Sequence, residues 1–477
     1  MEGYIVSLII FTAVFALFSL GLNLQWGFTG LLNFGQVAFM LVSAYWVVIC
    51  TANGYLKSLP ETMLREFDWL RDTPAIAPFL QFLTTILPAQ LPMIAAASLG
   101  ALIAALLGLV MGLATLKLRT DYLAIVTIGT SEILRSIALN EEWLTRGSFG
   151  IQRFPLPLAE LNPSYGVRIV MILCLTVIVG LGYVSLWQWL RRTVQTIPWR
   201  VLGRQSAILL VYGAFIVGGL WGTGAIAHSF KVASALPTWV PIWLANSFPL
   251  LILTIIIGVG VWIAQRFLRR LSALSSSIAL VAVFATTGWG LWVYGYAVSA
   301  LYHYERNPTK TGLMWISVLM LASVFWGLER LVRSPWGRVL KAIREDEDIV
   351  RALGKNVFWY KLQSLMLGGA ITGLSGALYA WQLTTIYPDN FKPIATFNGW
   401  TIIVLGGAGS NVGTLLGAVL FWTYQTLSRF VLDDILPFSD AQMGAIRVML
   451  IGLLLMVLMM WRPQGILGNQ DELTLNR

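Results

Sequence analysis

Apolar runs long enough to cross a bilayer, separated by short polar stretches, extend through almost the whole chain. Because one crossing takes about 20 apolar residues, the pattern predicts continuous spans at residues 3–22, 28–51, 89–116, 121–139, 167–189, 207–226, 241–265, 274–298, 312–330, 358–381 and 443–461. Glycines between 406 and 413 interrupt the stretch 396–430, which predicts two shorter helices that meet at a turn. We therefore expect an all-α, polytopic transmembrane helical bundle of about 13 spans with glycine-broken helices.

The composition supports lipid as the solvent of this chain. Hydrophobic residues make up 57% and charged residues only 11%, whereas soluble domains carry about 25% charged residues. The formal charge of +10 does not indicate nucleic-acid binding, because the basic residues lie in short loops between apolar runs. More than half of the 32 Lys and Arg residues fall in loops on one side if the N-terminus lies outside, so the positive-inside rule predicts that orientation.

Few residues are suited to catalysis or to metal binding. Cys50 and Cys174 lie within apolar runs, and His228 and His303 have no acidic or sulfur ligand beside them at metal-binding spacing. The few polar residues are too dispersed for a Ser/His/Asp arrangement to be argued. We expect a chain that is not an enzyme and that binds no metal and no cofactor of its own.

The longest charged stretch, residues 330–361, falls on the predicted inner side. Ser334 and Pro335 are suited to begin a helix and Gly354 to end it, which predicts one short helix of about 17 residues. Apolar residues recur at mostly helical intervals, and residues 345–348 form an acidic patch flanked by Arg and Lys. Such a helix either is a solvated connection or lies at the membrane face and offers charge to a partner. The pattern alone leaves both roles open.

The same segment resembles the coupling loop of the branched-chain amino acid ABC permeases of the LivM type. The matching residues are Gly337-Arg338, Lys341-Ala342-Ile343-Arg344-Glu345, Ala352-Leu353-Gly354 and Tyr360-Lys361-Leu362. Four further blocks resemble the family in the same order: Gly21-Leu22-Asn23 with Gly27 through Gln36, Leu116 through Thr127 with Glu132-Ile133, Ile403 through Ser410, and Trp461 through Leu467. A single glycine motif is weak evidence, but ordered blocks across most of a chain are a specific signal.

The resemblance implies a type II-like ABC importer permease whose cytoplasmic coupling segment, residues 331–357, docks to an ATPase subunit. The residues assigned to this coupling are Arg344, Glu345, Asp346, Glu347, Asp348, Leu353 and Gly354. The implied partners are a second, related permease of the LivH type, two ATPase subunits that hold ATP and Mg2+, and a periplasmic or lipid-anchored substrate-binding protein. The implied location is the bacterial inner (plasma) membrane.

The cargo implied by the resemblance is branched-chain or other neutral amino acids. A urea or short-amide ABC permease is the nearest alternative, because the urea permeases are similar over the same blocks. A stand-alone channel or ion-coupled carrier is an alternative from another class. It would need a coupling-ion site or a pore ring of acidic or carbonyl ligands, and neither is evident in the sequence.

The chain departs from the family pattern in one large region. In the family a single span separates the block at residues 145–151 from the coupling loop, and the span 312–330 takes that place here. Residues 167–300 are then expected to be an insert of four spans, an even number that keeps the coupling segment on the ATPase side. We expect one transmembrane permease domain, residues 1–477, that contains this insert.

Ionisable and polar residues inside predicted spans are further candidates. Glu132 and Arg135 stand three residues apart on one helix and can pair, either as a structural pair near the outer mouth or as part of the wall of the translocation path. Asn33 and Gln36 either bond to a neighbouring helix or line that path. The sequence leaves both alternatives open.

Three small residues at four-residue spacing predict close helix packing. Gly409, Gly413 and Gly417 would fall on one helical face, where small side chains let a neighbouring backbone approach. The run also resembles a phosphate loop superficially, but no Gly-Lys-Ser/Thr follows at the required spacing. We therefore expect helix packing here and no ATP binding by this chain.

Overall fold

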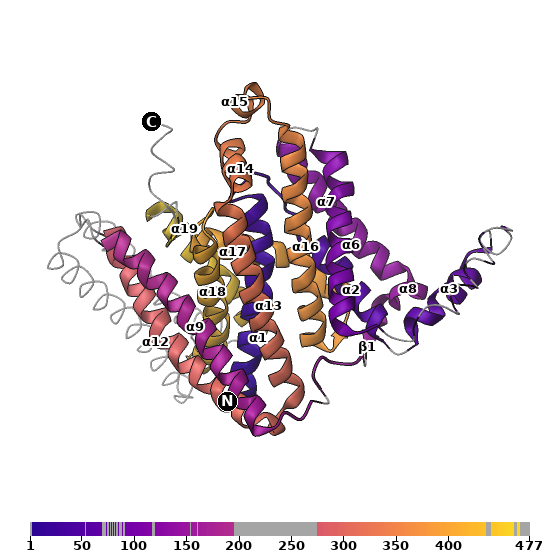
Figure 1. The fold of residues 1–477 in the computed structure, drawn as a ribbon, viewed down its shortest axis with the longest axis horizontal. Coiled ribbons are helices and arrows are strands. Elements are labelled where there is room, and N and C mark those ends of the chain that lie inside the picture. Colours follow the sequence, from indigo (N-terminus) through magenta and orange to yellow (C-terminus); the bar gives the residue numbers. More distant parts are fainter. Residues whose placement is uncertain are drawn as a thin grey trace, which may run out of the picture. The chain divides into compact units, whose positions relative to one another are not determined.

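The computed structural model describes residues 2–52, 54–68, 91–116, 120–152, 154–159, 161–194, 274–435, 440–461 and 465–467, with single residues between 73 and 88. Its α-helices are α1 (Glu2–Gln25), α2 (Val37–Thr51), α3 (Tyr55–Glu66), α6 (Met93–Thr115), α7 (Thr120–Asn140), α8 (Glu142–Thr145), α9 (Tyr165–Val194), α12 (Leu274–Tyr302), α13 (Pro308–Arg333), α14 (Pro335–Glu345), α15 (Glu347–Ala352), α16 (Val357–Leu383), α17 (Ile394–Gly406), α18 (Asn411–Ile435) and α19 (Asp440–Trp461) (Figure 1). The 3-10 helices are η1 (Gly147–Phe149), η3 (Tyr304–Arg306) and η4 (Pro388–Phe391). Strands β1 (Ile151–Gln152) and β2 (Thr385–Ile386) pair antiparallel, with Ile151 opposite Ile386.

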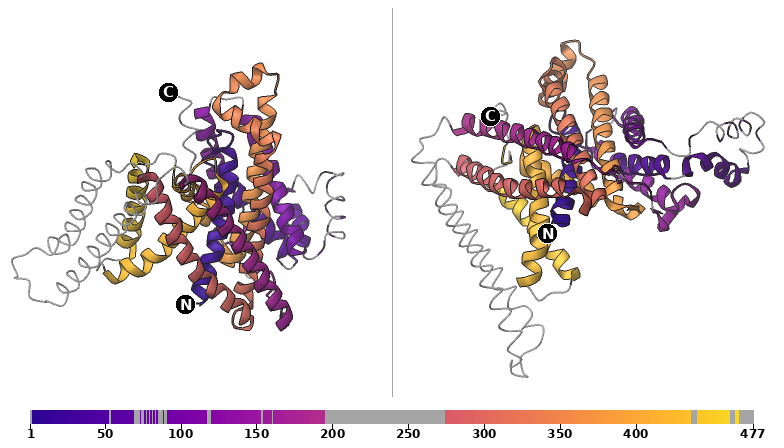
Figure 2. Two further views of the ribbon diagram at one scale, coloured as in Figure 1. Left: turned by 60° about the vertical axis from the view of Figure 1, so that its left-hand side comes forward. Right: turned by 60° about the horizontal axis from the view of Figure 1, so that its bottom comes forward.

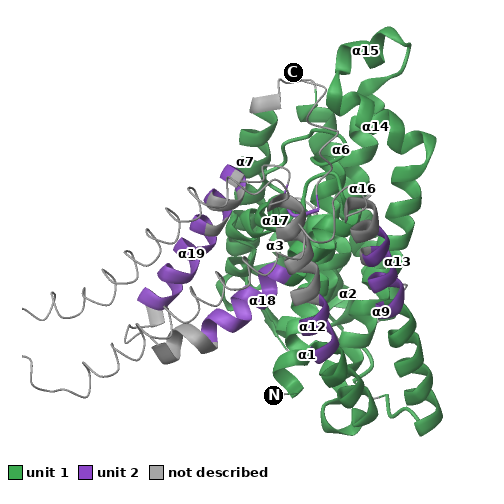
Figure 3. Cartoon of the chain, turned by 90° about the vertical axis from the view of Figure 1, so that its left-hand side faces the viewer, with its two compact units in different colours: residues 1–178, 293–419, 468–477 green, residues 179–292, 420–467 purple. Residues whose placement is uncertain are grey.

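The chain divides into two compact units (Figure 3). Unit 1 comprises residues 1–178, 293–419 and 468–477, and unit 2 comprises residues 179–292 and 420–467. Within unit 2, the Tyr183 hydroxyl donates a hydrogen bond to the Thr287 carbonyl at 3.2 Å and so joins α9 to α12. The candidate site described below lies in unit 1.

Five of the described helices are long and apolar enough to cross a membrane, or up to seven spans if each bent pair of helices counts as one. The five are α1, α6, most of α7, the first part of α9, and α13. Helices α12, α16 and α19 occupy the predicted spans 274–298, 358–381 and 443–461. The predicted spans 207–226 and 241–265 lie outside the described residues. The part of the chain that the structure describes is thus almost entirely helical, with five to seven candidate membrane spans, and the total of about 13 spans stays a prediction from length.

Helix α16 lies at the centre of unit 1, where it packs against α1, α2 and α6 (Figure 1). Glycines bring it close to each neighbour: Gly368 faces Gly21 of α1, Gly373 faces residues 100–104 in the middle of α6, and Gly376 faces the backbone of Met40 in α2. Helices in lipid gain little from the hydrophobic effect when they associate, so close packing of small residues takes its place. These glycines therefore hold the bundle together.

The prediction of one helix over residues 28–51 is wrong at its start. Residues 26–29 form a turn, residues 30–36 are not helical, and α2 begins only at Val37. Gly30 has a φ of +78°, a conformation that side chains other than glycine rarely adopt. Polar side chains in this stretch bond to nearby backbone and side-chain groups, which offers the chain an alternative to helical hydrogen bonds. We call residues 26–36 the α1–α2 loop.

The predicted break in the stretch 396–430 is confirmed. Between the helical segments Pro388–Gly406 and Asn411–Arg429 the direction of the chain bends by 116°. Gly407 and Gly409 have φ values of +118° and +76°, so two residues between the helices require glycine for the sharp turn. We call residues 407–410 the α17–α18 turn.

Helices α14 and α15 lie at one end of α13 and α16 in unit 1, and the N-terminus and the β1–β2 pair lie at the other end (Figures 1 and 2). Helix α1 therefore ends, at Gln25, beside the α14 end of the unit. This arrangement agrees with the expectation that the N-terminus and the charged segment 331–357 lie on opposite sides of the bilayer.

We predict that Gly368→Ala destabilises the protein. A Cβ atom at residue 368 would lie 2.7 Å from the Gly21 carbonyl oxygen, and one at residue 21 would lie 2.5 Å from the Gly368 oxygen. Overpacking costs about 1–3 kcal/mol, which exceeds the gain of about 1 kcal/mol that alanine brings to a helix. The measurement is the midpoint of thermal unfolding of the purified protein in detergent.

The matched control is Gly327→Ala on α13, where an added Cβ would meet nothing within 4 Å. This variant should leave the midpoint unchanged or raise it, since only helix propensity changes. Equal midpoints for Gly368→Ala and Gly327→Ala would contradict the close packing of α1 on α16.

Candidate functional site

Helix α14 is anchored to unit 1 through its apolar face. Leu340 is fully buried in a cluster with Leu24, Phe28, Leu328 and Val332, so it contacts α1, the α1–α2 loop and α13. Burying a leucine side chain is worth about 1.5–3 kcal/mol. Helix α14 is therefore packed against the bundle and is not a fully solvated connection.

The charged segment forms two helices, not the single helix of about 17 residues predicted from its ends. Asp346 is extended, with a φ of −154°, and its Oδ1 accepts hydrogen bonds from the backbone N–H groups of Asp348 at 2.9 Å and Ile349 at 3.1 Å. It is thus the N-cap of α15. Gly354, with a φ of +75°, follows the end of α15 as expected. A strong N-cap within the segment, which the apolar spacing did not indicate, is the physical reason for the break.

Most of the acidic patch is paired within the segment. Glu347 pairs with Arg351 and with Lys361 of α16, and Asp348 lies 3.6 Å from Arg351. Glu345 pairs with Arg344 at 2.8 Å. The acidic residues therefore shape α15 and its approach to α16.

Two apolar side chains are exposed at the tip of α15, beside the exposed Asp348 and Arg351. Ile349 is 59% exposed and Leu353 is 75% exposed. These residues stand four apart and form one small face. Leu353 was predicted from the family resemblance, whereas Ile349 was not. Its position four residues before Leu353 would have placed both on the same helical face.

Arg344 points into unit 1 instead of outward. Its side chain is 20% exposed, and its guanidinium donates a hydrogen bond to the backbone carbonyl of Gly27 in the α1–α2 loop. An added Cβ at Gly30 would lie 3.3 Å from Arg344 Cγ, so the loop is shaped around this side chain. Arg344 therefore joins α14 to the α1–α2 loop, a contact between residues 317 positions apart that the sequence did not reveal.

The α1–α2 loop leads directly into a buried polar network. Asn33 Nδ2 donates to Gln25 Oε1 and to Gln36 Oε1, both at 2.8 Å, and Asn33 Oδ1 accepts from the Gly35 N–H at 2.8 Å. Gln36 in turn donates to the Thr372 hydroxyl of α16. Asn33 and Gln36 are 0% exposed, so in this conformation they bond to other protein groups and line no aqueous space.

A second set of bonds joins the same region to the α17–α18 turn. Asn23, near the end of α1, accepts a hydrogen bond from the Gly409 N–H at 2.9 Å and donates to Asn411 at 3.4 Å. Asn411 also donates to Glu329 of α13 at 2.9 Å. The ends of α1, α13 and α17 and the start of α18 are thereby connected.

Glu132 and Arg135 form the expected pair on α7. The Arg135 guanidinium donates to Glu132 Oε2 at 2.8 and 2.9 Å and to Asp389 of η4 at 3.0 Å. The side chains of Arg135 and Glu132 are 20% and 35% exposed. Because η4 directly follows β2, this group lies toward the end of unit 1 opposite α14.

Two of the three glycines proposed for packing contact α17. A Cβ at Gly413 would lie 2.7 Å from the Gly406 carbonyl oxygen, and one at Gly417 would meet the backbone of Ile402 and Gly406. Gly409 was expected on the same helical face, and this expectation is wrong. It lies before the first residue of α18, in the left-handed conformation of the turn.

No group of three or more His, Cys, Asp or Glu residues in the part of the chain that the structure describes could hold a metal ion. Cys50 is buried and Cys174 is half-buried. His303 precedes η3, and His228 lies outside the described residues.

The chain is similar to proteins of known function. The family model described as the permease component of the branched-chain amino acid transport system matches residues 4–208 and 162–459. The probable branched-chain amino acid transport permease LivM of Methanocaldococcus jannaschii is 25% identical over 289 residues, which cover 57% of this chain and 82% of the relative. No solved structure matches the chain.

Two Escherichia coli K12 proteins of high-affinity branched-chain amino acid transport are also similar. Their permease LivM is 30% identical over 164 residues, or 34% of this chain and 36% of the relative. Their permease LivH is 26% identical over 272 residues, or 57% of this chain and 79% of the relative. The family matches together cover most of the chain, from residue 4 to residue 459. The chain therefore belongs to the family of permease components of branched-chain amino acid transport systems and is a multi-pass transport subunit of an ABC system.

Proposed function

We propose that this chain is the LivM-type half of an ABC importer that carries branched-chain or other neutral amino acids across a bacterial inner membrane. Its partners would be a LivH-type permease, two ATPase subunits that bind ATP and Mg2+, and a substrate-binding protein at the outer face. The observation that carries the proposal is the pair α14–α15, which is anchored in the bundle and ends in the exposed Ile349 and Leu353. An apolar tip on a rigid base is suited to a groove in a partner protein.

The coupling path that we propose begins at this tip and ends in the buried polar network. Motion of the ATPase subunits would shift α15 and α14 together, because Ile343, Val350 and Val357 form one buried cluster across the two helices and the start of α16. Arg344 would pass the shift to Gly27, and the α1–α2 loop would pass it to Asn33, Gln36 and α16. Discrete rearrangements of such bonded and packed elements are what carry coupling between distant sites.

The amino acid cargo rests on the branched-chain amino acid transport that the relatives carry out, and a urea or short-amide permease is the second candidate. Selectivity in such a system would lie largely in the substrate-binding protein. A stand-alone channel or ion-coupled carrier is disfavoured by α15, since such a protein has no need of an exposed apolar tip beyond its spans. Co-purification of ATPase subunits with the chain distinguishes the two classes.

We predict that Ile349→Ser/Leu353→Ser releases the ATPase subunits. Both side chains are exposed and would be buried only in the complex, so their loss weakens docking on the order of ten-fold or more. The measurement is the amount of ATPase subunit that co-purifies with the tagged chain. The matched control is Ile394→Ser, a 56% exposed isoleucine at the start of α17. Normal ATPase recovery with the double variant would contradict the docking role of α15.

For Arg344 we predict a different result. Arg344→Ala removes the bond to Gly27 but leaves the apolar tip intact, so the ATPase subunits should stay bound while uptake per ATP hydrolysed falls several-fold. The measurement is paired uptake and ATP hydrolysis in proteoliposomes. The comparison is Lys355→Ala, at an exposed position just after α15, which should leave coupling unchanged. If Arg344→Ala instead releases the ATPase subunits, Arg344 contacts the partner and our internal path is wrong.

A variant at Glu132 tests whether this residue belongs to the wall of the translocation path. Glu132→Leu would leave Arg135 paired with Asp389 alone. We predict lower uptake by a complex that still assembles, because ionisable side chains within membrane spans typically mark the pathway of the transported solute. Uptake by vesicles is compared with subunit recovery on purification. Glu142→Leu, on α8 of unit 1, is the control. Unchanged uptake would make the Glu132–Arg135 pair purely structural.

A further inference from the structure

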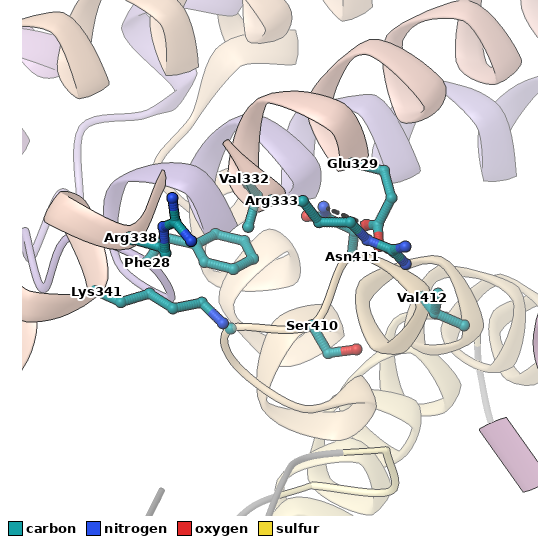
Figure 4. A pocket seen from close by; sticks show the side chains of 10 residues that line it. Phe28, Glu329, Val332, Arg333, Arg338, Lys341, Ser410, Asn411 and Val412 are labelled. Carbon is teal, nitrogen blue, oxygen red and sulfur yellow. Dashed lines mark hydrogen bonds and ion pairs between the residues drawn. The ribbon is translucent and has the colours of Figure 1, made fainter. Parts of the chain in front are cut away.

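The two ends of unit 1 differ in the contacts that join their helices. At the α14 end, Glu329 of α13 is bound by Arg333 at 2.6 Å and by Asn411 of α18 at 2.9 Å, beside a pocket that α14 also lines (Figure 4). At the opposite end, β1 pairs with β2, and these strands come from segments far apart in the sequence (Figure 1). We call the paired residues, 151–152 and 385–386, the β1–β2 clasp.

The clasp is held by a short ladder and by buried apolar side chains. Each strand is two residues long, and Ile151 lies opposite Ile386. Ile151 is 2% exposed and Ile386 is 0% exposed. Two strands that pair without further neighbours are marginally stable in water. The burial of these two isoleucines therefore favours the paired arrangement.

The polar contacts beside the clasp are partly exposed. Gln152 Nε2 donates a hydrogen bond to the Tyr387 hydroxyl at 3.3 Å, and the Arg135 guanidinium of α7 donates to Asp389 of η4 at 3.0 Å. Asp389 is 62% exposed, and ion pairs open to solvent contribute little to stability. These bonds can therefore break and form again with little change in free energy. Arg135 also belongs to the pair that we propose as part of the wall of the translocation path.

Both strands of the clasp follow a residue with a strained backbone. Among the described residues, three that are not glycine have a positive φ, and two of them precede the clasp. Arg146, with a φ of +60°, lies shortly before β1, and Thr384, with a φ of +63°, lies directly before β2. Such angles are uncommon for residues other than glycine and are least favourable for a β-branched residue such as threonine. Backbone strain of this kind occurs at clamps and switch regions, where the surrounding structure maintains it.

Gly150 lets the two segments approach each other at the clasp. It has a φ of +63°, and an added Cβ atom there would overlap the Ile386 carbonyl oxygen. Since only glycine fits both this backbone conformation and this close approach, the paired state has one well-defined arrangement. The clasp is therefore a specific structure and not a loose contact between two loops.

We propose that the β1–β2 clasp is a gate at the outer end of the translocation path, which separates and pairs again in each transport cycle. Separation exposes Ile151 and Ile386 and relaxes the backbone at Arg146 and Thr384. Burial thus favours the paired state and strain opposes it, which is the balance expected of an element with two discrete arrangements. This inference rests on the proposed function, in which cargo enters from the outer face and ATPase subunits drive the cycle.

The first test measures how fast Ile151→Cys reacts with a membrane-impermeant maleimide in the complex with its ATPase subunits in nanodiscs. A cysteine there is buried while the clasp is paired. Its rate should differ on the order of ten-fold or more between the nucleotide-free complex and the complex trapped with ATP and vanadate, because a thiol must be accessible to react. The matched control is Gln152→Cys, at the exposed neighbouring position, which should react at similar rates in both states. Equal rates for Ile151→Cys in the two states would overturn the proposal.

The second test locks the clasp with Gln152→Cys/Thr385→Cys, two positions that lie opposite each other. The Cα atoms of opposite residues on antiparallel strands are about 4.5–5.5 Å apart, a distance that a disulfide can bridge. Oxidation should abolish leucine uptake by proteoliposomes, and a reductant should restore it. The matched control joins the same two cysteines by a long, flexible bismaleimide, which permits separation and should preserve uptake. Normal uptake after complete oxidation, with the disulfide verified by mass spectrometry, would rule out a gate at this position.

The two tests distinguish this inference from the proposed function. A labelling rate that depends on nucleotide, in a complex that takes up no amino acid, would support the clasp and contradict the proposed cargo. Amino acid uptake with an unchanged labelling rate would contradict the clasp alone.

Discussion

Polar groups inside a membrane bundle must find their hydrogen-bond partners within the protein, and the structure of unit 1 depends on how the α1–α2 loop meets this requirement. The loop is not helical, and its backbone groups bond in other ways: the Gly30 N–H donates to the Trp26 carbonyl, and the Gly35 N–H donates to Asn33 Oδ1. The side chains of Asn33 and Gln36 also bond to each other, to Gln25 and to α16. The glycines of α16 and α1 allow the helices to approach closely enough for these bonds.

The same loop is contacted at its other surface by the segment that we propose to couple to the ATPase. Arg344 bonds to Gly27, and Leu340 packs against Phe28. Asn23 ties the end of α1, just before the loop, to the α17–α18 turn. In the coupling path that we propose, a movement of α14 would reach this loop, and packed, hydrogen-bonded elements of this kind change between discrete arrangements more readily than they deform continuously.

Charge in the coupling segment is divided between two tasks. The acidic residues pair with nearby arginine and lysine side chains and fix α15 against α16. We propose that contact with a partner falls to the exposed, apolar Ile349 and Leu353. The basic residues of α14 instead face a pocket at the end of α13. The sequence suggested that the segment offers one charged surface to another protein. The structure instead separates it into exposed apolar residues on α15, the hydrogen bond from Arg344 to Gly27, and basic residues of α14 that face the interior of unit 1.

The sequence by itself determined the parts of the protein that depend on local physics. Hydropathy predicts most helices because each spanning helix must be apolar along its length, and the glycines before α18 predict the turn because few other residues adopt its backbone angles. The pairing of Glu132 with Arg135 follows from helical spacing alone. The ordered motifs also sufficed to predict the family.

Only the tertiary structure decided the start of α2, the division of the coupling segment at Asp346, the inward direction of Arg344 and the buried partners of Asn33 and Gln36. The bond from Arg344 to Gly27 and that from Gln36 to Thr372 join residues more than 300 positions apart. Whether a polar side chain lines a path or satisfies a buried backbone depends on which distant helix packs beside it. No local pattern of residues records that choice.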